Sequence, residues 1–246
     1  MHVTPPPRWI PRNLVKEVFE QGHSDGILPD SLSLLDDNLN ATLADAFRAH
    51  PWVDEVRLVK KSFPATIHVD LAYRQPVAMV EVPQGLYPVD VRSVLLPPAD
   101  FSAEQAATYP LIQGVRSAPL GGPGSAWGDP VVLQSARLAA TLGTHWKTLQ
   151  LEAIVCPKVS TSESPGVFIL ASRGSHILWG KPPGVDDPGE PTTAQKVGRL
   201  EKYIADYGAF DRPRGPYEID IRPFRVISRR PILQNPTSYR MDRELR

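Results

Sequence analysis

Proline is the sequence feature that most constrains this chain, because it occupies 27 of the 246 positions. That share is about 11%, roughly twice the usual ~5%. Proline has a fixed φ angle and no backbone N–H, so it interrupts helices and central strands. The sequence therefore predicts short elements joined by stiff corners, and not a helical bundle. Hydrophobic residues make up 41% of the chain, which is enough for a buried core.

Charge and cysteine content exclude several classes of protein. Lys+Arg and Asp+Glu number 27 each, so the formal net charge is zero. This balance argues against binding to nucleic acid or to an anionic membrane through the overall charge of the chain. The single cysteine, Cys156, excludes an internal disulfide framework and a multi-thiolate metal site. No stretch approaches the ~18 apolar residues of a membrane span, and the opening residues lack the apolar region of a secretory signal.

The first 76 residues combine two predicted helices with a hairpin. Apolar residues at helical spacing predict one helix over 11–20, ended by Gly22, and a second helix between Asp36 or Asp37 and Pro51. Residues 55–60 and 66–73 predict the two strands of the hairpin. Apolar and polar residues alternate in the second strand, which is typical of a half-buried antiparallel strand packed against helices.

The rest of the chain predicts a mixed, mostly antiparallel β region with flanking helices, so the fold class is α+β. We expect strands at 77–82, 86–89, 94–96, 111–112, 149–153, 167–170, 175–179, 217–221 and 224–228.

Two helices in this region have clear boundary signals. Asp129-Pro130 starts one helix, with a capping carboxylate followed by proline in the first turn. Thr192 and Gln195 form the capping box of another helix, which ends at Gly208. We expect the buried face of this last helix to comprise Val197, Leu200, Ile204 and Tyr207.

No motif for catalysis or cofactor binding stands out. The chain lacks a phosphate-binding glycine loop, a dinucleotide fingerprint, His-Glu-x-x-His and Gly-x-Ser-x-Gly. Ser175 and His176 are neighbours on a predicted strand, so they point to opposite faces and cannot act as nucleophile and base. We interpret Cys156 as a buried, inert thiol, and Trp52, Trp146 and Trp179 as core anchors in preference to a ligand platform.

These observations predict a binding or scaffold protein. We expect no catalytic residues, no cofactor, no metal site, no small-molecule substrate and no nucleic-acid partner.

Short motifs, in the right order between roughly residues 30 and 228, resemble the bacterial cell-division family FtsQ (DivIB). Pro51-Trp52-Val53, the hairpin turn at Phe63-Pro64 and Tyr73-Arg74-Gln75-Pro76-Val77-Ala78 are similar to the POTRA domain of that family. Leu86-Tyr87-Pro88-Val89-Asp90, Tyr109-Pro110-Leu111-Ile112-Gln113-Gly114 and Ile219-Asp220-Ile221-Arg222 are similar to its β domain.

The resemblance implies a POTRA-type domain at 1–76, with its first strand at His2-Val3-Thr4, an FtsQ-type β domain at 77–231 and a basic polar tail at 232–246. It implies a non-enzymatic scaffold of the division machinery outside the inner membrane. Its membrane contact would come only through a single N-terminal helix, which is not among these residues. From Arg222 onward the chain contains seven arginines and only two acidic residues, so this part of the chain is net positive.

The family's partners, FtsB and FtsL, bind largely through the last strands of the β domain. An edge strand exposes unpaired N–H and C=O groups, which an added strand can satisfy. The equivalent strand here is 224–229, between Pro223 and Pro231. The resemblance assigns partner binding to Arg222, Phe224, Arg225, Val226, Ile227 and Arg229. Alternatively, the arginines of this edge strand only prevent aggregation and bind no partner.

The chain departs from the family pattern at two positions besides the missing membrane helix. Ser93 stands where the family usually has glycine, and Pro223 stands where many members have an aromatic residue. Two other functions remain open from the sequence. One is an outer-membrane assembly or secretion component with POTRA domains, and the other is a hydrolase that uses Ser175 or a histidine.

Overall fold

The computed structural model describes residues 1–29, 31–157, 166–185 and 188–232. Its helices and mostly antiparallel strands confirm the predicted α+β class. The chain divides into two compact units, Met1–Ala140 and Thr141–Arg246. A domain boundary at residue 76 stays a prediction, and nearly all of the basic tail lies outside the described residues.

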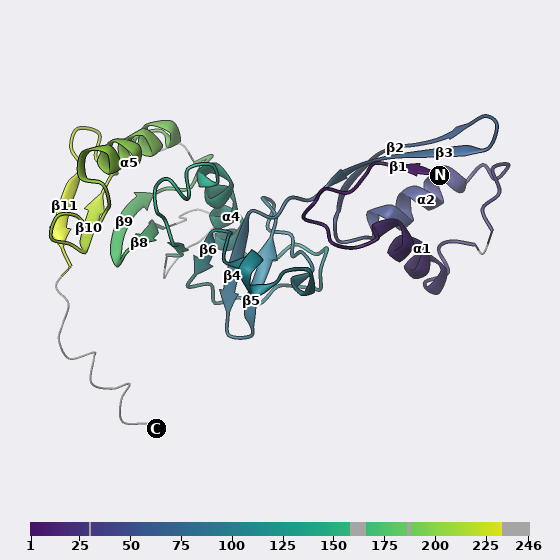
Figure 1. Ribbon diagram of the computed structural model, residues 1–246, viewed down its shortest axis with the longest axis horizontal. Coiled ribbons are helices and arrows are strands. Elements are labelled where there is room, and N and C mark those ends of the chain that lie inside the picture. The colour runs from purple at the N-terminus through teal and green to yellow at the C-terminus, as the bar shows by residue number, and fades with distance from the viewer. Residues whose placement is uncertain (30, 158–165, 186–187, 233–246) are drawn as a thin grey trace, which may run out of the picture. The chain divides into compact units, whose positions relative to one another are not determined.

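In the first unit, two helices pack on a three-stranded sheet with strand order β1-β3-β2 (Figure 1). Strand β1 (His2–Val3) runs parallel to β3 (Thr66–Tyr73), which pairs antiparallel with β2 (Val53–Ser62). The helices are α1 (Leu14–Ser24) and α2 (Leu39–Arg48). The predicted pair of helices and the hairpin are therefore confirmed, and β3 has the expected bounds.

The alternation along β3 decides which face of this sheet is buried. Ile67, Val69 and Leu71 are each no more than 7% exposed and belong to one cluster with both helices. The helical members of that cluster are Leu14, Val18, Leu39, Leu43, Ala46 and Phe47. Burial of each large apolar side chain contributes about 1.5–3 kcal/mol, so this cluster holds the helices to the sheet.

Gly22 does not end the first helix as predicted. It lies inside α1, which continues to Ser24. A Cβ at this position would come within 2.6 Å of the Leu28 side chain. Gly22 is thus explained by the close approach of Leu28 to the helix, and not by helix termination.

The remainder of the first unit is built from short elements. Strand β4 (Ala78–Val82) pairs antiparallel with β5 (Gly85–Val89) and parallel with β6 (Leu111–Gln113). A 3-10 turn, η1 (Pro98–Asp100), and helix α3 (Ala103–Ala106) lie between β5 and β6 in sequence. The strand expected at 94–96 is reduced to isolated bridges at Val94 and Leu95. Ser93 adopts a φ of 57°, in the left-handed region that favours glycine.

Helix α4 (Pro130–Leu142) begins at the predicted Asp129-Pro130 signal and leads into the second unit. That unit arranges its strands in the order β7-β8-β9-β10-β11, with β9 and β10 parallel and the other described pairs antiparallel. The crossover between the parallel pair contains α5, as parallel neighbours require. The elements are β7 (Ala153–Val155), β8 (Phe168–Ser172), β9 (Ser175–Gly180), α5 (Thr193–Tyr207), β10 (Tyr217–Asp220) and β11 (Ser228–Pro231).

Helix α5 has the predicted boundaries but a different buried face. The Thr192–Gln195 capping box and the left-handed Gly208 are both present. The residues it buries, however, are Lys196, Leu200 and Tyr203. Of the predicted face only Leu200 is fully buried, while Tyr207 is 44% exposed.

Lys196 can be buried because it has two partners outside the helix. Its Nζ lies 2.5 Å from a Glu190 carboxylate oxygen and 5.2 Å from the centre of the Trp179 ring. A buried ammonium is tolerated only when it is paired in this way. Trp179 itself is fully buried, as are Trp52 and Trp127, and Trp146 is 7% exposed. The interpretation of the predicted tryptophans as core anchors is confirmed.

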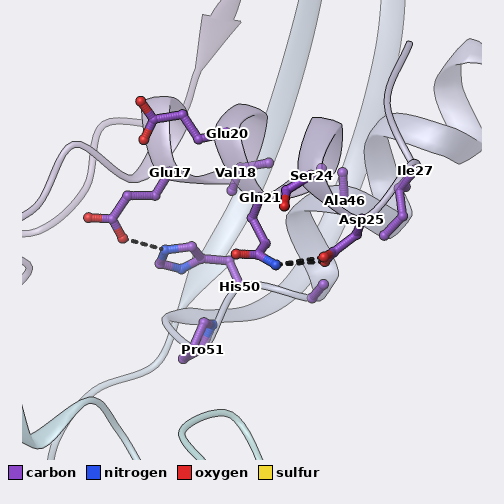
Figure 2. Close-up of a pocket in the computed structure, with 12 residues that line it drawn as sticks. Glu17, Val18, Glu20, Gln21, Ser24, Asp25, Ile27, Ala46, His50 and Pro51 are labelled. Carbon is purple, nitrogen blue, oxygen red and sulfur yellow. Dashed lines mark hydrogen bonds and ion pairs between the residues drawn. The ribbon is translucent and has the colours of Figure 1, made fainter.

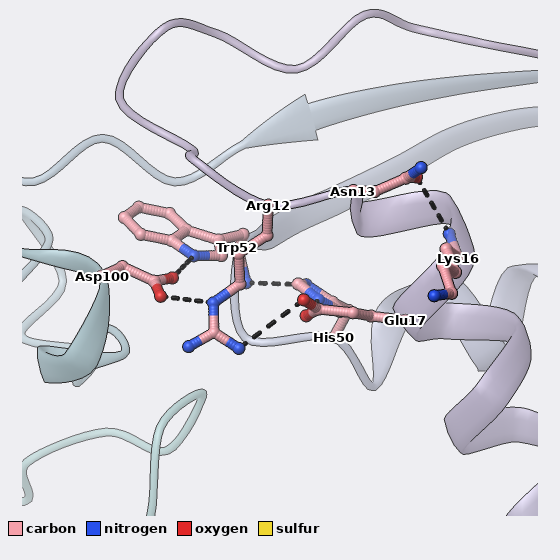
Figure 3. A network of polar contacts seen from close by, with 7 residues as sticks. All are labelled: Arg12, Asn13, Lys16, Glu17, His50, Trp52 and Asp100. Atoms are coloured by element: carbon pink, nitrogen blue, oxygen red, sulfur yellow. Dashed lines mark hydrogen bonds and ion pairs between the residues drawn. The ribbon is translucent and has the colours of Figure 1, made fainter.

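The buried carboxylate of Asp100 in η1 forms hydrogen bonds to residues near the two helices of the first unit. Asp100, whose side chain is 3% exposed, accepts hydrogen bonds from the Arg12 guanidinium and from the Trp52 indole, the latter at 2.8 Å (Figure 3). Arg12 also lies 3.6 Å from Glu17, which in turn lies 3.3 Å from His50 Nε2. Hydrogen bonds to a charged group contribute about 1.5–3 kcal/mol each, so Asp100 is a strong local tether.

The surroundings of His50 favour its neutral form. Its side chain is 9% exposed, and its Nδ1 accepts the backbone N–H of Trp52 at 3.3 Å. Burial lowers the pKa of His50 from its ordinary 6.5, although Glu17 acts in the opposite direction. A proton on Nδ1 would place two donors against each other.

The free energy of unfolding should therefore depend on pH through His50. Because the folded pKa is below the unfolded one, the unfolded state takes up the proton first, and stability falls as the pH drops below about 6.5. His50→Gln should lose this part of the pH dependence. Urea denaturation between pH 7.5 and pH 5 measures it, with the exposed His176→Gln as control. An identical pH dependence in wild type and His50→Gln would contradict the prediction.

Candidate partner-binding edge

The last described strand, β11, forms the edge of the second unit's sheet. It pairs antiparallel with β10 in the register Glu218↔Arg230 and Asp220↔Ser228, and it has no second strand neighbour within the described residues. The edge strand was predicted at 224–229, but it covers Ser228–Pro231. That prediction is therefore wrong in position, because residues 223–225 form a bend and residues 226–227 belong to no regular element.

Arg199 of α5 explains why the chain bends before β11. Its guanidinium donates to the backbone carbonyls of Ile221, at 2.8 Å, Pro223, at 2.5 Å, and Phe224. Pro223 also lacks an N–H for a ladder. With these carbonyls directed at Arg199, the segment cannot use them for pairing with a strand, and regular pairing resumes only at Ser228.

The hydrogen-bonding groups on the open side of β11 follow from its register. The Ile232 N–H donates to the Pro216 carbonyl at 2.9 Å, and the Tyr217 N–H points the other way, to Ser175 Oγ at 3.0 Å. Alternation along an antiparallel pair then directs the Ser228 and Arg230 groups toward β10, and the N–H and C=O of Arg229 away from it. Pro231 adds an outward C=O but no N–H.

The Arg229 side chain is positioned by two tyrosines. Its guanidinium lies 4.6 Å from the centre of the Tyr207 ring and 5.2 Å from that of Tyr217. Such cation–π contacts are worth about 0.5–1 kcal/mol at exposed sites. These contacts hold the Arg229 guanidinium against the Tyr207 and Tyr217 rings.

A groove of about 420 Å³ runs between α5 and the segment leading into β11. We call it the β11 groove, and its lining residues are Arg199, Lys202, Tyr203, Asp206, Tyr207, Arg225, Val226, Ile227 and Arg229. Lys202 pairs with Asp206 at 2.9 Å, and Arg199 is bound to backbone carbonyls. Arg225 forms no hydrogen bond or ion pair in the described part of the chain, so Arg225 and Arg229 give the groove an available positive charge.

Apolar side chains are exposed on the same segment. Val226 is 66% exposed and Phe224 is 52% exposed. Val226 and Ile227 line the β11 groove, whereas Phe224 lines a separate pocket beside the start of α5. The structure thus brings Arg225, Val226, Ile227 and Arg229 together around one groove and separates Phe224 from them.

Arg222 lies apart from this groove and has an internal partner. Its guanidinium forms a two-point contact with the Asp220 carboxylate, at 2.8 and 2.7 Å. This contact holds the pKa of Asp220 below its ordinary value of 3.8, against the effect of partial burial. Arg222 therefore fixes the end of β10, and its charge is largely compensated.

The sequence analysis missed Arg199, Tyr207 and Tyr217 as parts of this site. Tyr207 was assigned to a buried face, and nothing in the local pattern marks an arginine that binds carbonyls more than 20 residues away. Only the packing of α5 beside the segment 221–229 reveals these roles.

Ser175 and Cys156, the two residues considered above for chemistry, are both buried. Ser175 is fully buried, and its hydroxyl donates to the Phe210 carbonyl at 3.1 Å while it accepts the Tyr217 N–H. The hydroxyl thus links β9 to the start of β10 and is not presented to solvent as a nucleophile. Cys156 is buried, 7% exposed. In the described ranges no helix is long and apolar enough to cross a bilayer.

Replacing Arg222 should release the Asp220 carboxyl. In Arg222→Gln we expect the Asp220 pKa to rise toward its ordinary value, because the main contact that stabilises the carboxylate is removed. The contact contributes stability above the ordinary pKa, and that stability is lost as the pH falls through the lower, folded pKa. Carboxyl NMR titration measures the shift, and Arg225→Gln is the control that should leave Asp220 unchanged. An unchanged Asp220 pKa in Arg222→Gln would contradict this account.

Comparison with known proteins shows a partial similarity. No protein-family model matches the chain. A stretch of 63 residues, 26% of this chain, is 41% identical to the cell division protein FtsQ of Anaeromyxobacter sp. (strain K). The match covers 20% of that relative's length.

Proposed function

We propose that this chain is a non-enzymatic scaffold of bacterial cell division that binds FtsB/FtsL-like partners. The single observation that carries the proposal is the 41% identity over 63 residues to an FtsQ protein. The open edge of β11 supports it, because it provides a place where such a partner could add a strand. By the same similarity, this region lies outside the inner membrane and is anchored by one N-terminal helix.

The chemistry of the edge specifies the binding mode that we propose. A partner strand would pair with the Arg229 N–H and C=O and donate to the Pro231 C=O. Because only one outward N–H is available, backbone pairing would be short. Side chains must therefore supply much of the affinity, and the exposed Val226 with the cations Arg225 and Arg229 would favour a segment that carries apolar and acidic residues.

A pair of substitutions separates backbone from side-chain binding. Arg229→Pro removes the outward N–H together with the side chain, whereas Arg229→Ala removes only the side chain. Proline is tolerated on an edge strand where its missing N–H faces outward. We expect Arg229→Pro to bind an FtsB/FtsL-like partner about fivefold more weakly than Arg229→Ala, as loss of one hydrogen bond implies. Titration of the co-purified partner complex measures both.

A third variant tests the groove. Val226→Asp places a charge on the exposed apolar surface and should strongly reduce recovery of the partner. Equal affinity of Arg229→Pro and Arg229→Ala, with loss of binding in Val226→Asp, would overturn strand addition but retain partner binding. Full recovery with all three variants would contradict partner binding at this edge. Circular dichroism and urea denaturation check that each variant is folded.

The proposed anchor has its own test. About 20 apolar residues encoded directly before Met1 would form a membrane-spanning helix. With such a segment, the full-length protein should sediment with the inner membrane, and its loss should release the protein. Recovery of the native, full-length protein in the cytoplasm would contradict the proposed location.

A further inference from the structure

A groove of the first unit lies between α1 and the end of α2, far in sequence from the β11 edge. It has a volume of about 660 Å³, and Figure 2 shows the side chains that line it. We call it the α1–α2 groove, and its lining residues are Glu17, Val18, Glu20, Gln21, Gly22, Ser24, Asp25, Ile27, Ala46, Ala49, His50 and Pro51. Nothing in the proposed scaffold function uses this groove.

The polar wall of the groove is one continuous face of α1. Glu17, Glu20, Gln21, Ser24 and Asp25 follow each other at the i, i+3, i+4, i+7 and i+8 positions, which place them on one side of a helix. Eight residues of helix extend over about 12 Å. The groove is thus elongated, with a row of polar side chains along one wall.

Small apolar side chains form the rest of the groove. Val18 and Ala46 are 2% and 5% exposed at its base, and Ile27 is 38% exposed at one end. Ala49 and Pro51 continue this surface past the end of α2. Ile27 and Ala49 are the exposed apolar residues of the groove, so the fitting occupant carries apolar side chains that cover them.

The charge of the groove has one sign. Three carboxylates, those of Glu17, Glu20 and Asp25, line it, and no lysine or arginine is among its lining residues. The charge of Asp25 is not balanced by a cation, because its carboxylate accepts from the neutral Gln21 amide at 2.8 Å. Asp25 also caps the carboxyl end of α1, where the helix dipole adds further negative potential.

The nearby cations compensate this charge only in part. Lys16 lies 3.5 Å from Glu20, but both side chains are about two-thirds exposed, and such surface pairs are weak. Arg12 lies 3.6 Å from Glu17 while it binds the buried Asp100. The groove therefore keeps a net negative charge along its length.

We propose that the α1–α2 groove is a docking site for a basic amphipathic helical segment of a partner protein. Apolar side chains of that segment cover Ile27 and Ala49, while its lysines or arginines face Glu20 and Asp25. This is the helix-in-groove mode of recognition, in which apolar anchors give contact area and charges set the orientation.

Titration with a model peptide tests this site on the full chain. The probe is a helical peptide with leucines on one face and lysines four residues apart beside them, and its counterpart has glutamates in place of the lysines. We expect the lysine peptide to shift the amide NMR signals of residues 17–27 and 46–51 and the glutamate peptide to leave them unchanged. Absence of shifts at these residues, or equal binding of both peptides, would overturn the proposal.

Three variants separate the groove from general charge attraction. The double variant Glu20→Lys with Asp25→Lys should weaken the lysine peptide about tenfold or more, because it juxtaposes like charges. Ala49→Leu should weaken it by filling the groove without a change in charge. Glu104→Lys, on the exposed first turn of α3, is the control and should have little effect.

Each alternative occupant gives a distinct result. If Ala49→Leu binds as tightly as wild type, attraction is only electrostatic and the groove proposal fails. If the same amide signals shift with protein concentration in the absence of peptide, a second copy of this chain occupies the groove, which also overturns the proposal. Loss of FtsB/FtsL-like binding at β11 would leave these outcomes unaffected.

Discussion

The missing N–H of proline is the constraint on which the layout of this molecule depends. Every buried backbone donor and acceptor needs a partner, and proline removes the donor at fixed points along the chain. Helix α2 ends at Arg48, shortly before Pro51, and the strand pairing of β11 follows Pro223 and closes at Pro231. The prolines thus set the lengths of the elements, and packing of apolar faces then decides how these short elements meet.

The zero net charge of the chain conceals two local surfaces of opposite sign. The α1–α2 groove in the first unit is lined by carboxylates, whereas the β11 groove in the second unit presents Arg225 and Arg229. Each surface combines its charge with exposed or shallow apolar groups, a combination typical of protein-binding surfaces. The net charge of the whole chain does not reveal these two local charges. They are recognised only when the structure shows which residues line each groove.

The sequence predicted elements well where local signals were complete. Three features were predicted in this way: the capping box of α5, the alternation of β3 and the helix start at Asp129-Pro130. The residues that produce each of them lie close together in the sequence. Predictions failed where a distant partner intervened. Lys196 is buried because Glu190 and Trp179 contact it, and the bend at 223–225 exists because Arg199 binds carbonyls there. No local pattern contains these pairings, since tertiary contacts override helical periodicity.

The sequence by itself determined the α+β class, the two caps of α5, the buried face of β3 and the segment that contains the candidate edge. Periodicity, capping and proline positions are local properties, so they can be read without the fold. Only the tertiary structure decided that β11 begins at Ser228, that Arg229 alone offers an outward N–H, and that the polar face of α1 borders a groove. These depend on register and on contacts between distant residues, because a shift of one residue reverses which groups a strand presents.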